Sequence, residues 1–255
     1  MVDLNFSVLG SKKPPVILLH GLFGMGDNLL ALAKVLEKNY TVYRLDLRNH
    51  GRSSSEKTMS LPEMADDVRA WMDEQGIERM NFVGHSLGGK VAMQLALTWP
   101  ERVNKLVVAD IAPVEYPPHH SDVLEGLQKV ELSTLSSRRD ADQVLSRFIE
   151  ESGVRQFLLK SLYKNDQGFH WRFNLDVIVT AYDHLRQGVS GESFLNPVLF
   201  IKGENSKYIR AENQSVIKQL FPNFDFKVIQ DTGHWLHAEK PAVFNRLVER
   251  FLLGG

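Results

Sequence analysis

Continuous apolar runs alternate with amphipathic stretches through the first 110 residues of the chain. Mostly apolar runs such as 16–20 and 103–109 are typical of strands that are covered on both faces of a sheet. Apolar residues three and four positions apart, as in 87–98, predict helices between these strands. This alternation favours an α/β fold with a mostly parallel, doubly wound sheet flanked by helices. In chain order, the pattern predicts an edge strand at 4–9, strands at 16–20, 40–47, 80–85 and 103–109, and helices at about 27–38, 60–75 and 87–98.

The pattern changes after Asp110. From about 121 to 191 the residues follow amphipathic helical spacing, without a convincing buried strand among them. A helical insertion of this length predicts a cap at 114–191 over a core formed by 1–113 and 192–255. After the cap, the core pattern resumes with strands at 198–201 and 224–229 and helices at 211–221 and 241–252.

Ser86 lies between a predicted strand and a predicted helix, with glycines two positions before and two positions after it. In this context, Gly84-x-Ser86-x-Gly88 is the pattern of a nucleophile elbow, a sharp turn that exposes a serine hydroxyl. The glycines leave room because the strand and the helix nearly touch at such a turn. The hydroxyl would lie at the positive end of the following helix. We therefore predict that Ser86 is a nucleophile.

Composition and charge exclude several other classes of function. The chain has 255 residues and a formal net charge of −1 without a long run of one sign, so we expect neither a nucleic-acid partner nor an anionic membrane surface. The absence of cysteine excludes disulfides and cysteine-based metal or nucleophile sites. No apolar run approaches the length of a membrane span, and the first residues do not resemble a signal peptide. We expect a cytoplasmic protein without stable membrane insertion.

Nucleotide and metal sites also lack support in the sequence. Gly21, Gly24 and Gly26 do not form the dinucleotide-binding pattern, and no phosphate-binding loop of the Gly-Lys-Ser/Thr type occurs. His119 and His120 lack the spacing of metal ligands and are expected on the cap. We therefore predict neither a cofactor nor a metal.

Several separate segments together resemble the α/β-hydrolase superfamily. The order of His20-Gly21, the Ser86 elbow, a helical cap and Gly233-His234 spans nearly the whole chain. More narrowly, the chain is similar to the bacterial YbfF esterases, and the mammalian mitochondrial ABHD-type relatives share its Arg-Asn-His-Gly turn. The resemblance implies an α/β-hydrolase fold with a helical cap. The segments that carry the narrower resemblance are 19–24, 46–51, 84–86, 110–113 and 233–241.

The resemblance implies that His234 is the general base for Ser86. His234 follows the last predicted strand, where the superfamily keeps its catalytic histidine, and a serine hydroxyl needs an adjacent base at neutral pH. His237 is the alternative, although we expect it to pack or cap at the start of the closing helix. His20 and His85 resemble residues that hold the neighbouring loops by hydrogen bonds.

Asp110 and Glu204 are the two candidates for the acid of a catalytic triad. The superfamily most often places this acid after the strand that follows the cap, where Ser206 stands at about the usual aspartate position and Glu204 lies nearby. YbfF-like proteins use the end of the strand after the elbow helix instead, which implies Asp110. A lone carboxylate beside an apolar run also needs a partner, because a buried charge is costly. We predict Asp110, with Glu204 as the alternative and Asp231 as a residue that shapes its loop.

An oxyanion hole requires two backbone N–H groups directed at the developing negative oxygen. The residue after the nucleophile supplies one of them in this fold, which is Leu87 here. By analogy with the family, the second comes from the loop at 20–23. Leu22 is the first candidate for that donor and Phe23 is the alternative.

The charged turn at 46–50 has two interpretations. In one, Arg48 binds a phosphate or a carboxylate of the substrate. In the other, which we favour, the turn is hydrogen-bonded internally and braces the elbow.

The resemblance implies a serine esterase or thioesterase that works through a Ser-His-Asp triad and an acyl-enzyme. Short-to-medium acyl esters and acyl-CoA thioesters are the candidate small-molecule substrates. Two alternatives stay open, because a fold does not select a reaction. The first is another reaction at the same site, such as carbon–carbon bond hydrolysis or perhydrolysis, and the second is a receptor that binds a small ligand under the cap. The sequence leaves the oligomeric state undetermined.

Overall fold

The computed structural model describes residues 2–254, and a seven-stranded sheet forms its centre. The strands lie in the order β1-β3-β2-β4-β5-β8-β9, and every neighbouring pair is parallel except β1 with β3. The prediction of a mostly parallel sheet with an edge strand near the N-terminus is confirmed. With η for short 3₁₀ helices, the first half of the core contains β1 (Phe6–Leu9), β2 (Pro15–Leu19), η1 (Gly26–Leu29), α1 (Leu30–Leu36), β3 (Thr41–Leu45), α2 (Leu61–Glu74), β4 (Met80–His85), α3 (Leu87–Thr98), η2 (Pro100–Arg102) and β5 (Val103–Ala109).

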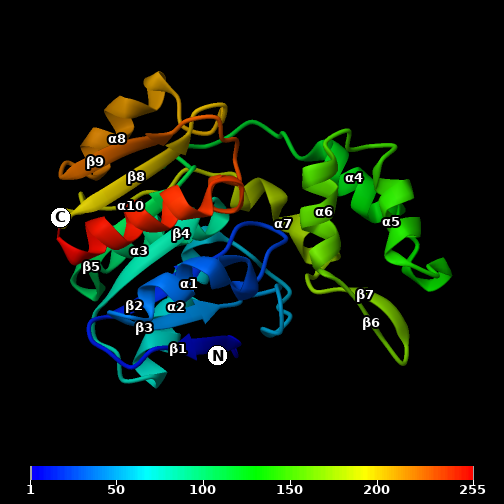
Figure 1. Ribbon diagram of the computed structural model, residues 1–255, viewed down its shortest axis with the longest axis horizontal. Helices are drawn as coiled ribbons and strands as arrows, with labels where there is room; N and C mark the ends of the chain where they lie inside the picture. The colour runs from blue at the N-terminus through cyan, green and yellow to red at the C-terminus, as the bar shows by residue number, and fades with distance from the viewer. Residues whose placement is uncertain (1, 255) are drawn as a thin grey trace.

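Helices cover both faces of the sheet, with α1 and α10 on one face and α2, α3 and α8 on the other (Figure 1). Neighbouring residues of β2 therefore enter different cores: Leu18 shares a core with Phe244 of α10, and Ile17 shares the other with Val91 of α3. Burial on both faces accounts for the unbroken apolar strands. Across residues 2–254, none of the helices combines the length and apolar character that a bilayer crossing demands. The second half of the core contains β8 (Val198–Gly203), η4 (Ala211–Asn213), α8 (Gln214–Leu220), β9 (Phe224–Ile229), α9 (Leu236–Glu239) and α10 (Pro241–Leu253).

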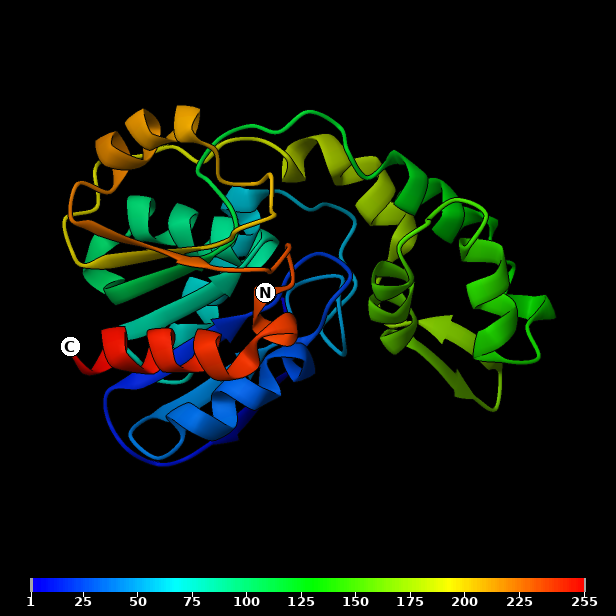
Figure 2. The same ribbon diagram turned by 45° about the horizontal axis from the view of Figure 1, so that its top comes forward.

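The segment between β5 and β8 forms a cap that lies to one side of the core, as both ribbon views show (Figures 1 and 2). Long connections at both ends of this segment join it to the core (Figure 2). The cap contains α4 (Ser121–Lys129), η3 (Leu132–Thr134), α5 (Arg138–Leu145), α6 (Ser152–Lys160), β6 (Leu162–Asn165), β7 (Gly168–Trp171) and α7 (Leu175–Leu185).

The expectation of a wholly helical cap was wrong for β6 and β7, which pair as an antiparallel hairpin (Figure 1). Gly168 begins β7 with a φ of 114°, a conformation that residues other than glycine rarely adopt. Leu162 and Phe169 are buried, whereas Lys164 and Asn165 are exposed. Strands of four residues alternate too briefly to be separated from an amphipathic helix, which is why the sequence pattern missed them.

Several hydrogen bonds attach the cap to the core, and two sets of them lie at the ends of cap helices. Ser161 Oγ, at the end of α6, donates to the carbonyl oxygen of Phe23 at 2.7 Å. Lys90 Nζ, on α3, donates to the carbonyl of Arg186 at 2.9 Å and to that of Gln187, where α7 ends. Burial lowers the pKa of Lys90 to about 7, while carbonyl groups at a helix C-terminus favour its cationic form.

The carboxyl ends of the parallel strands meet at one edge of the sheet. There β4 leads into Ser86, β5 into Asp110, and β9 into the loop that carries His234. His20 directly follows β2, which pairs with β4. Catalytic and binding groups of open α/β sheets lie at this edge, and the topology brings the predicted residues there from distant parts of the chain.

Candidate active site

Ser86 occupies a strained turn between β4 and α3. Its backbone has a φ of 52° and a ψ of −117°, which lies outside the regions that a serine normally populates. A Cβ at Gly84 would lie 2.3 Å from the carbonyl oxygen of Gly88, and one at Gly88 would lie 2.3 Å from that of Leu19. Only glycine fits at either position, so the two glycines are what allows strand and helix to approach each other at the serine.

His234 connects Ser86 to Asp110 through both of its ring nitrogens. Ser86 Oγ lies 3.0 Å from His234 Nε2, and Asp110 Oδ2 lies 2.8 Å from His234 Nδ1. Asp110 has no exposed surface and a φ of 54°, so the chain turns sharply where β5 ends and presents the carboxylate to the histidine. The structure thus brings together the three residues that the sequence suggested for a triad.

The Asp110 carboxylate has further donors besides the histidine. The amide of Gly203 donates to its Oδ1 at 3.0 Å, and Ser206 Oγ donates to its Oδ2. Burial raises the pKa of Asp110, whereas these two hydrogen bonds lower it by stabilising the ionised form. Glu204, the alternative acid, is exposed and accepts from the amide of Asp231 at 2.9 Å, away from the imidazole.

Burial keeps the imidazole of His234 in the form that a general base requires. It lowers the pKa of His234 to about 3, because the charged ring would lose its hydration, so the ring is neutral at pH 7. His85 Nε2 donates to the backbone carbonyl of His234 at 2.9 Å, which supports the loop role expected for His85. His237 is buried and packs as expected, with its ring centroid 4.4 Å from that of His85, but it lies in α9 and not at the start of the closing helix.

Tyr208 is a residue of the site that the sequence analysis missed. Its ring stacks on that of His234, with centroids 3.9 Å apart and planes inclined by 22°. Its hydroxyl lies 2.7 Å from His119 Nε2, and its carbonyl accepts from the hydroxyl of Tyr116 at 2.6 Å. His119 and His120 therefore face the site rather than only the cap surface. No sequence signal marks Tyr208, because it follows Ser206 in an irregular loop.

Two buried histidines fix the loop that holds the candidate oxyanion donors. His20 Nδ1 donates to the carbonyl of Gly21 at 2.8 Å, and His50 Nε2 accepts from the amide of Phe23 at 3.1 Å. The amide of Phe23 is thus already engaged, which favours Leu22 as the donor from this loop. Leu87 is the first residue of α3, and the first amides of a helix have no partner within it.

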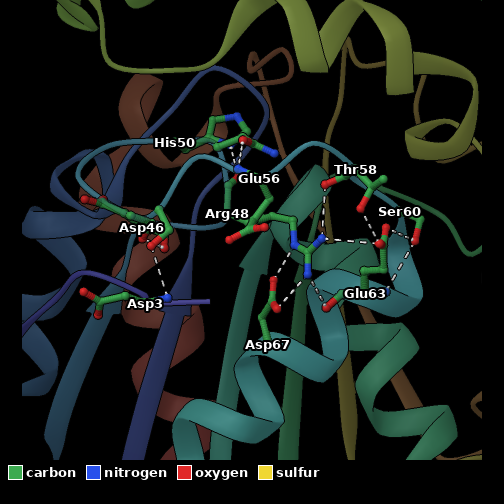
Figure 3. Close-up of polar contacts among 12 residues, drawn as sticks. Asp3, Asp46, Arg48, His50, Glu56, Thr58, Ser60, Glu63 and Asp67 are labelled. Atoms are coloured by element: carbon green, nitrogen blue, oxygen red, sulfur yellow. Dashed lines mark hydrogen bonds and ion pairs between the residues drawn. The ribbon is translucent and has the colours of Figure 1, made fainter. Parts of the chain in front are cut away.

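The charged turn before α2 is hydrogen-bonded to other parts of the protein, as in the interpretation that we favoured, and the elements that it braces are α2 and the loop after β2 (Figure 3). Arg48 and Asp67 are 7% and 9% exposed, and the guanidinium donates to both carboxylate oxygens at 2.5 and 2.7 Å. Arg48 also donates to the carbonyl of Thr58 at 3.1 Å. With its donors used in this way, Arg48 fastens the turn to α2 and does not line the cavity beside Ser86.

A cavity of about 490 Å³ opens beside Ser86, between the core and the cap. Val154, Phe157 and Leu158 of α6 supply an apolar wall, and His120 contributes polar surface near the serine. Burial lowers the pKa of His120 to about 3, so this side chain is neutral as well. Within residues 2–254, histidine and carboxylate side chains do not gather in groups of three or more that suit a metal ion.

A family model described as the alpha/beta hydrolase fold matches residues 14–133 and 150–241, which is most of the chain. The chain belongs to this family. Esterase YbfF of Escherichia coli strain K12 is 38% identical over 242 residues, which is 94% of each chain. The sn-1-specific diacylglycerol lipase ABHD11 of Mus musculus is 36% identical over 98% of this chain and 85% of its own. The solved structure of a marine microorganism esterase has a TM-score of 0.96 and 36% identity, over 98% of this chain and 100% of its own.

These comparisons confirm the resemblance to YbfF-type members of the α/β-hydrolase fold family. Because the relatives align over nearly the whole chain, the similarity includes the cap as well as the core. Within this α/β-hydrolase, Ser206 donates a hydrogen bond to Asp110, which follows a different strand, β5.

Proposed function

We propose that the protein is a serine hydrolase that cleaves carboxylic esters, with Ser86 as nucleophile, His234 as general base and Asp110 as the acid of the triad. One observation carries the proposal: a line of hydrogen bonds runs from Ser86 Oγ through both nitrogens of His234 to Asp110 Oδ2. The relatives that are named esterases and a lipase support the same reaction class.

In the first half of the reaction, His234 Nε2 takes the proton of Ser86 Oγ while this oxygen attacks the acyl carbonyl. The imidazolium that forms remains hydrogen-bonded to Asp110, which stabilises its charge. Collapse of the tetrahedral intermediate breaks the ester bond, and the alcohol leaves with the proton from His234 Nε2. In the second half, His234 takes a proton from water, the hydroxide attacks the acyl-enzyme, and Ser86 recovers its proton as the acid departs.

The negative oxygen of each tetrahedral intermediate would accept hydrogen bonds from the amides of Leu22 and Leu87. The N-terminus of α3 adds its partial positive charge at the same point. Because these donors belong to a loop and a helix that are already fixed, they would stabilise the transition state without reorganising. His20 and His50 support this arrangement by holding the loop in place.

The cavity supports a substrate with an apolar acyl group. Its volume of about 490 Å³ is that of a small-molecule site, and the wall formed by α6 is apolar. We therefore extend the proposal to short-to-medium acyl chains and to thioesters, with acyl-CoA among the candidates. The cytoplasmic location and the lack of a cofactor stay predictions.

The first test is intact-mass labelling of the purified protein with a fluorophosphonate probe. The wild type should gain the mass of one probe, whereas Ser86→Ala should gain none while keeping its circular dichroism spectrum. A folded wild-type protein that does not react would contradict the proposal, since its serine would not be activated. A panel of 4-nitrophenyl esters and matched acyl-CoA thioesters of increasing chain length would then define the substrate, and a diketone panel would test for carbon–carbon bond hydrolysis.

A further inference from the structure

A second, mostly polar cavity of about 280 Å³ lies between the core and the cap, apart from the one that contains Ser86. The loop after β2 separates the two, because its residues 21–23 line the first cavity and its residues 25–27 line the second. Helix α6 also borders both, with its middle on the first cavity and Lys160 at its end on the second. The second cavity is therefore built from both domains beside the candidate active site.

Five basic side chains line this second cavity, and each of the two acidic side chains there already has its own hydrogen-bond partners. Asp27 forms an ion pair of 2.6 Å with Arg44. The carboxylate of Asp46 accepts from the amides of Gly26 at 2.7 Å and Arg52 at 3.0 Å. The cations that remain are Arg52 from the core and Arg138, Lys160 and Arg172 from the cap.

These four cations have no carboxylate within ion-pair distance among the residues that the structure describes. The whole chain has a net charge of −1, so the cluster does not reflect a generally basic protein. Like charges around one cavity repel one another, and their repulsion opposes the contact between core and cap. A bound anion would remove this repulsion and bridge the two domains.

Two of the guanidinium groups are held in place by neighbouring groups of the cap. Arg138 donates through Nε and Nη2 to the carbonyl of Leu162, at 3.2 and 2.8 Å. The guanidinium of Arg172 lies over the ring of Tyr163, 4.4 Å from its centroid. Neither contact uses all the N–H donors of its guanidinium group. Two N–H donors of one guanidinium group can bind two oxygens of a phosphate at the same time.

We propose that this cavity is a binding site for phosphate or for a small phosphate ester, held by Arg52, Arg138, Lys160 and Arg172. The anion contacts residues of both the core and the cap, so its binding stabilises their association. Its source is either a free phosphate or nucleotide, or the phosphate group of a substrate whose reacting bond lies at Ser86.

Isothermal titration calorimetry on the full-length protein tests the site directly. Inorganic phosphate and ADP are titrated at constant ionic strength, so that binding is separated from screening. We expect saturable binding to the wild type and at least about tenfold weaker binding to Arg52→Gln/Lys160→Gln, because charge-assisted hydrogen bonds are lost. The side chains of these two residues make no hydrogen bond within residues 2–254, so the variant should fold normally.

The matched control is Arg139→Gln/Lys57→Gln, which removes one cation from each domain at exposed positions outside the cavity. It should bind phosphate as the wild type does. The proposal is overturned if neither phosphate nor ADP binds the wild type saturably, or if the cavity variant binds them as tightly as the wild type.

Steady-state kinetics identify the source of the anion. This kinetic experiment rests on the proposed hydrolase function, whereas the calorimetric experiment does not. If the site serves a free ligand, phosphate or ADP changes the KM for a neutral short-chain ester. If it serves a substrate, phosphate competes with an acyl-CoA thioester and leaves hydrolysis of the neutral ester unchanged. An inactive protein that still binds phosphate would contradict the hydrolase function alone.

Discussion

Ser206 Oγ donates a hydrogen bond to Asp110 Oδ2, the same oxygen that lies 2.8 Å from His234 Nδ1. The serine comes from the loop after β8, and the aspartate from the end of β5, the neighbouring strand. Ser206, at the position where the family most often has its acid, thus hydrogen-bonds the acid that we propose from the adjacent strand. Two carboxylates at these positions would repel each other. A serine instead supplies a hydroxyl donor, and the carboxylate of Asp110 accepts its hydrogen bond.

Asp110→Asn should lower kcat on the order of 10⁴-fold, because the amide cannot stabilise the imidazolium and favours the wrong tautomer of His234. Glu204→Gln should keep near wild-type activity, since Glu204 faces the amide of Asp231. Steady-state hydrolysis of a 4-nitrophenyl ester compares the two. If the Glu204 variant is the inactive one, the assignment of the acid is wrong.

Ser206→Ala should lower kcat by roughly 10- to 100-fold and leave KM almost unchanged, because a hydrogen bond to a charged group contributes about 1.5–3 kcal/mol. Ser206→Thr keeps the hydroxyl and serves as the control. The pH profile of kcat adds a second readout, since removal of the donor raises the pKa of Asp110 further. Equal rates for the alanine and threonine variants would refute this role of the hydroxyl.

Tyr208 should act by positioning His234 rather than by proton transfer. Tyr208→Phe keeps the ring that stacks at 3.9 Å, so we expect kcat close to that of the wild type. Tyr208→Ala removes the stacked ring and should lower kcat more than it raises KM. Kinetics for both variants over a range of pH, with thermal melting as a control for folding, separate the two effects. A larger loss of kcat in the phenylalanine variant would instead indicate that the hydroxyl takes part in the reaction.

The Arg48–Asp67 pair should stabilise the fold without taking part in catalysis (Figure 3). Arg48→Met leaves the buried carboxylate of Asp67 without its partner and should lower the free energy of unfolding by about 3–5 kcal/mol. Removal of both charges in Arg48→Met/Asp67→Leu should recover much of that loss. Urea denaturation measures both variants. Full stability in the single variant, or a selective loss of activity, would argue against this structural role.

Stability should fall as the pH falls below 6.5. Burial lowers the pKa of His20, and it lowers those of His50 and His85 to about 3, so the folded protein keeps these rings neutral while the unfolded chain protonates near 6.5. The contribution of His50 and His85 is complete above pH 6.5 and is lost between pH 6.5 and 3, by up to about 1.4 kcal/mol per group for each pH unit. The contribution of His20 is lost in the same direction as the pH falls. Burial raises the pKa values of Asp110 and Asp67, and these two groups act in the opposite direction.

Urea titrations at pH 7.5, 6.5 and 5.5 measure this dependence through the free energy of unfolding. A free energy that stays constant or rises on acidification would show that the buried histidines do not control stability in this range.

The local pattern of the sequence determined the architecture and the elbow. Buried parallel strands show as unbroken apolar runs because both of their faces are covered, and this signal requires only neighbouring residues. The glycine pattern around Ser86 is also a local signal, because the turn has no space for a side chain at Gly84 or Gly88. Resemblance to a family then indicated His234 and Asp110, whose roles no local pattern could have revealed.

Only the tertiary structure decided which groups meet around those residues. Tyr208 reaches His234, and Ser206 reaches Asp110, because β5, β8 and β9 are adjacent in the sheet and their following loops converge. The ion pair of Arg48 with Asp67 likewise joins segments that are far apart in the chain. The same holds for the second cavity, which both core and cap residues line. Such contacts follow from the packing of whole elements, so a pattern read over a few neighbouring residues does not contain them.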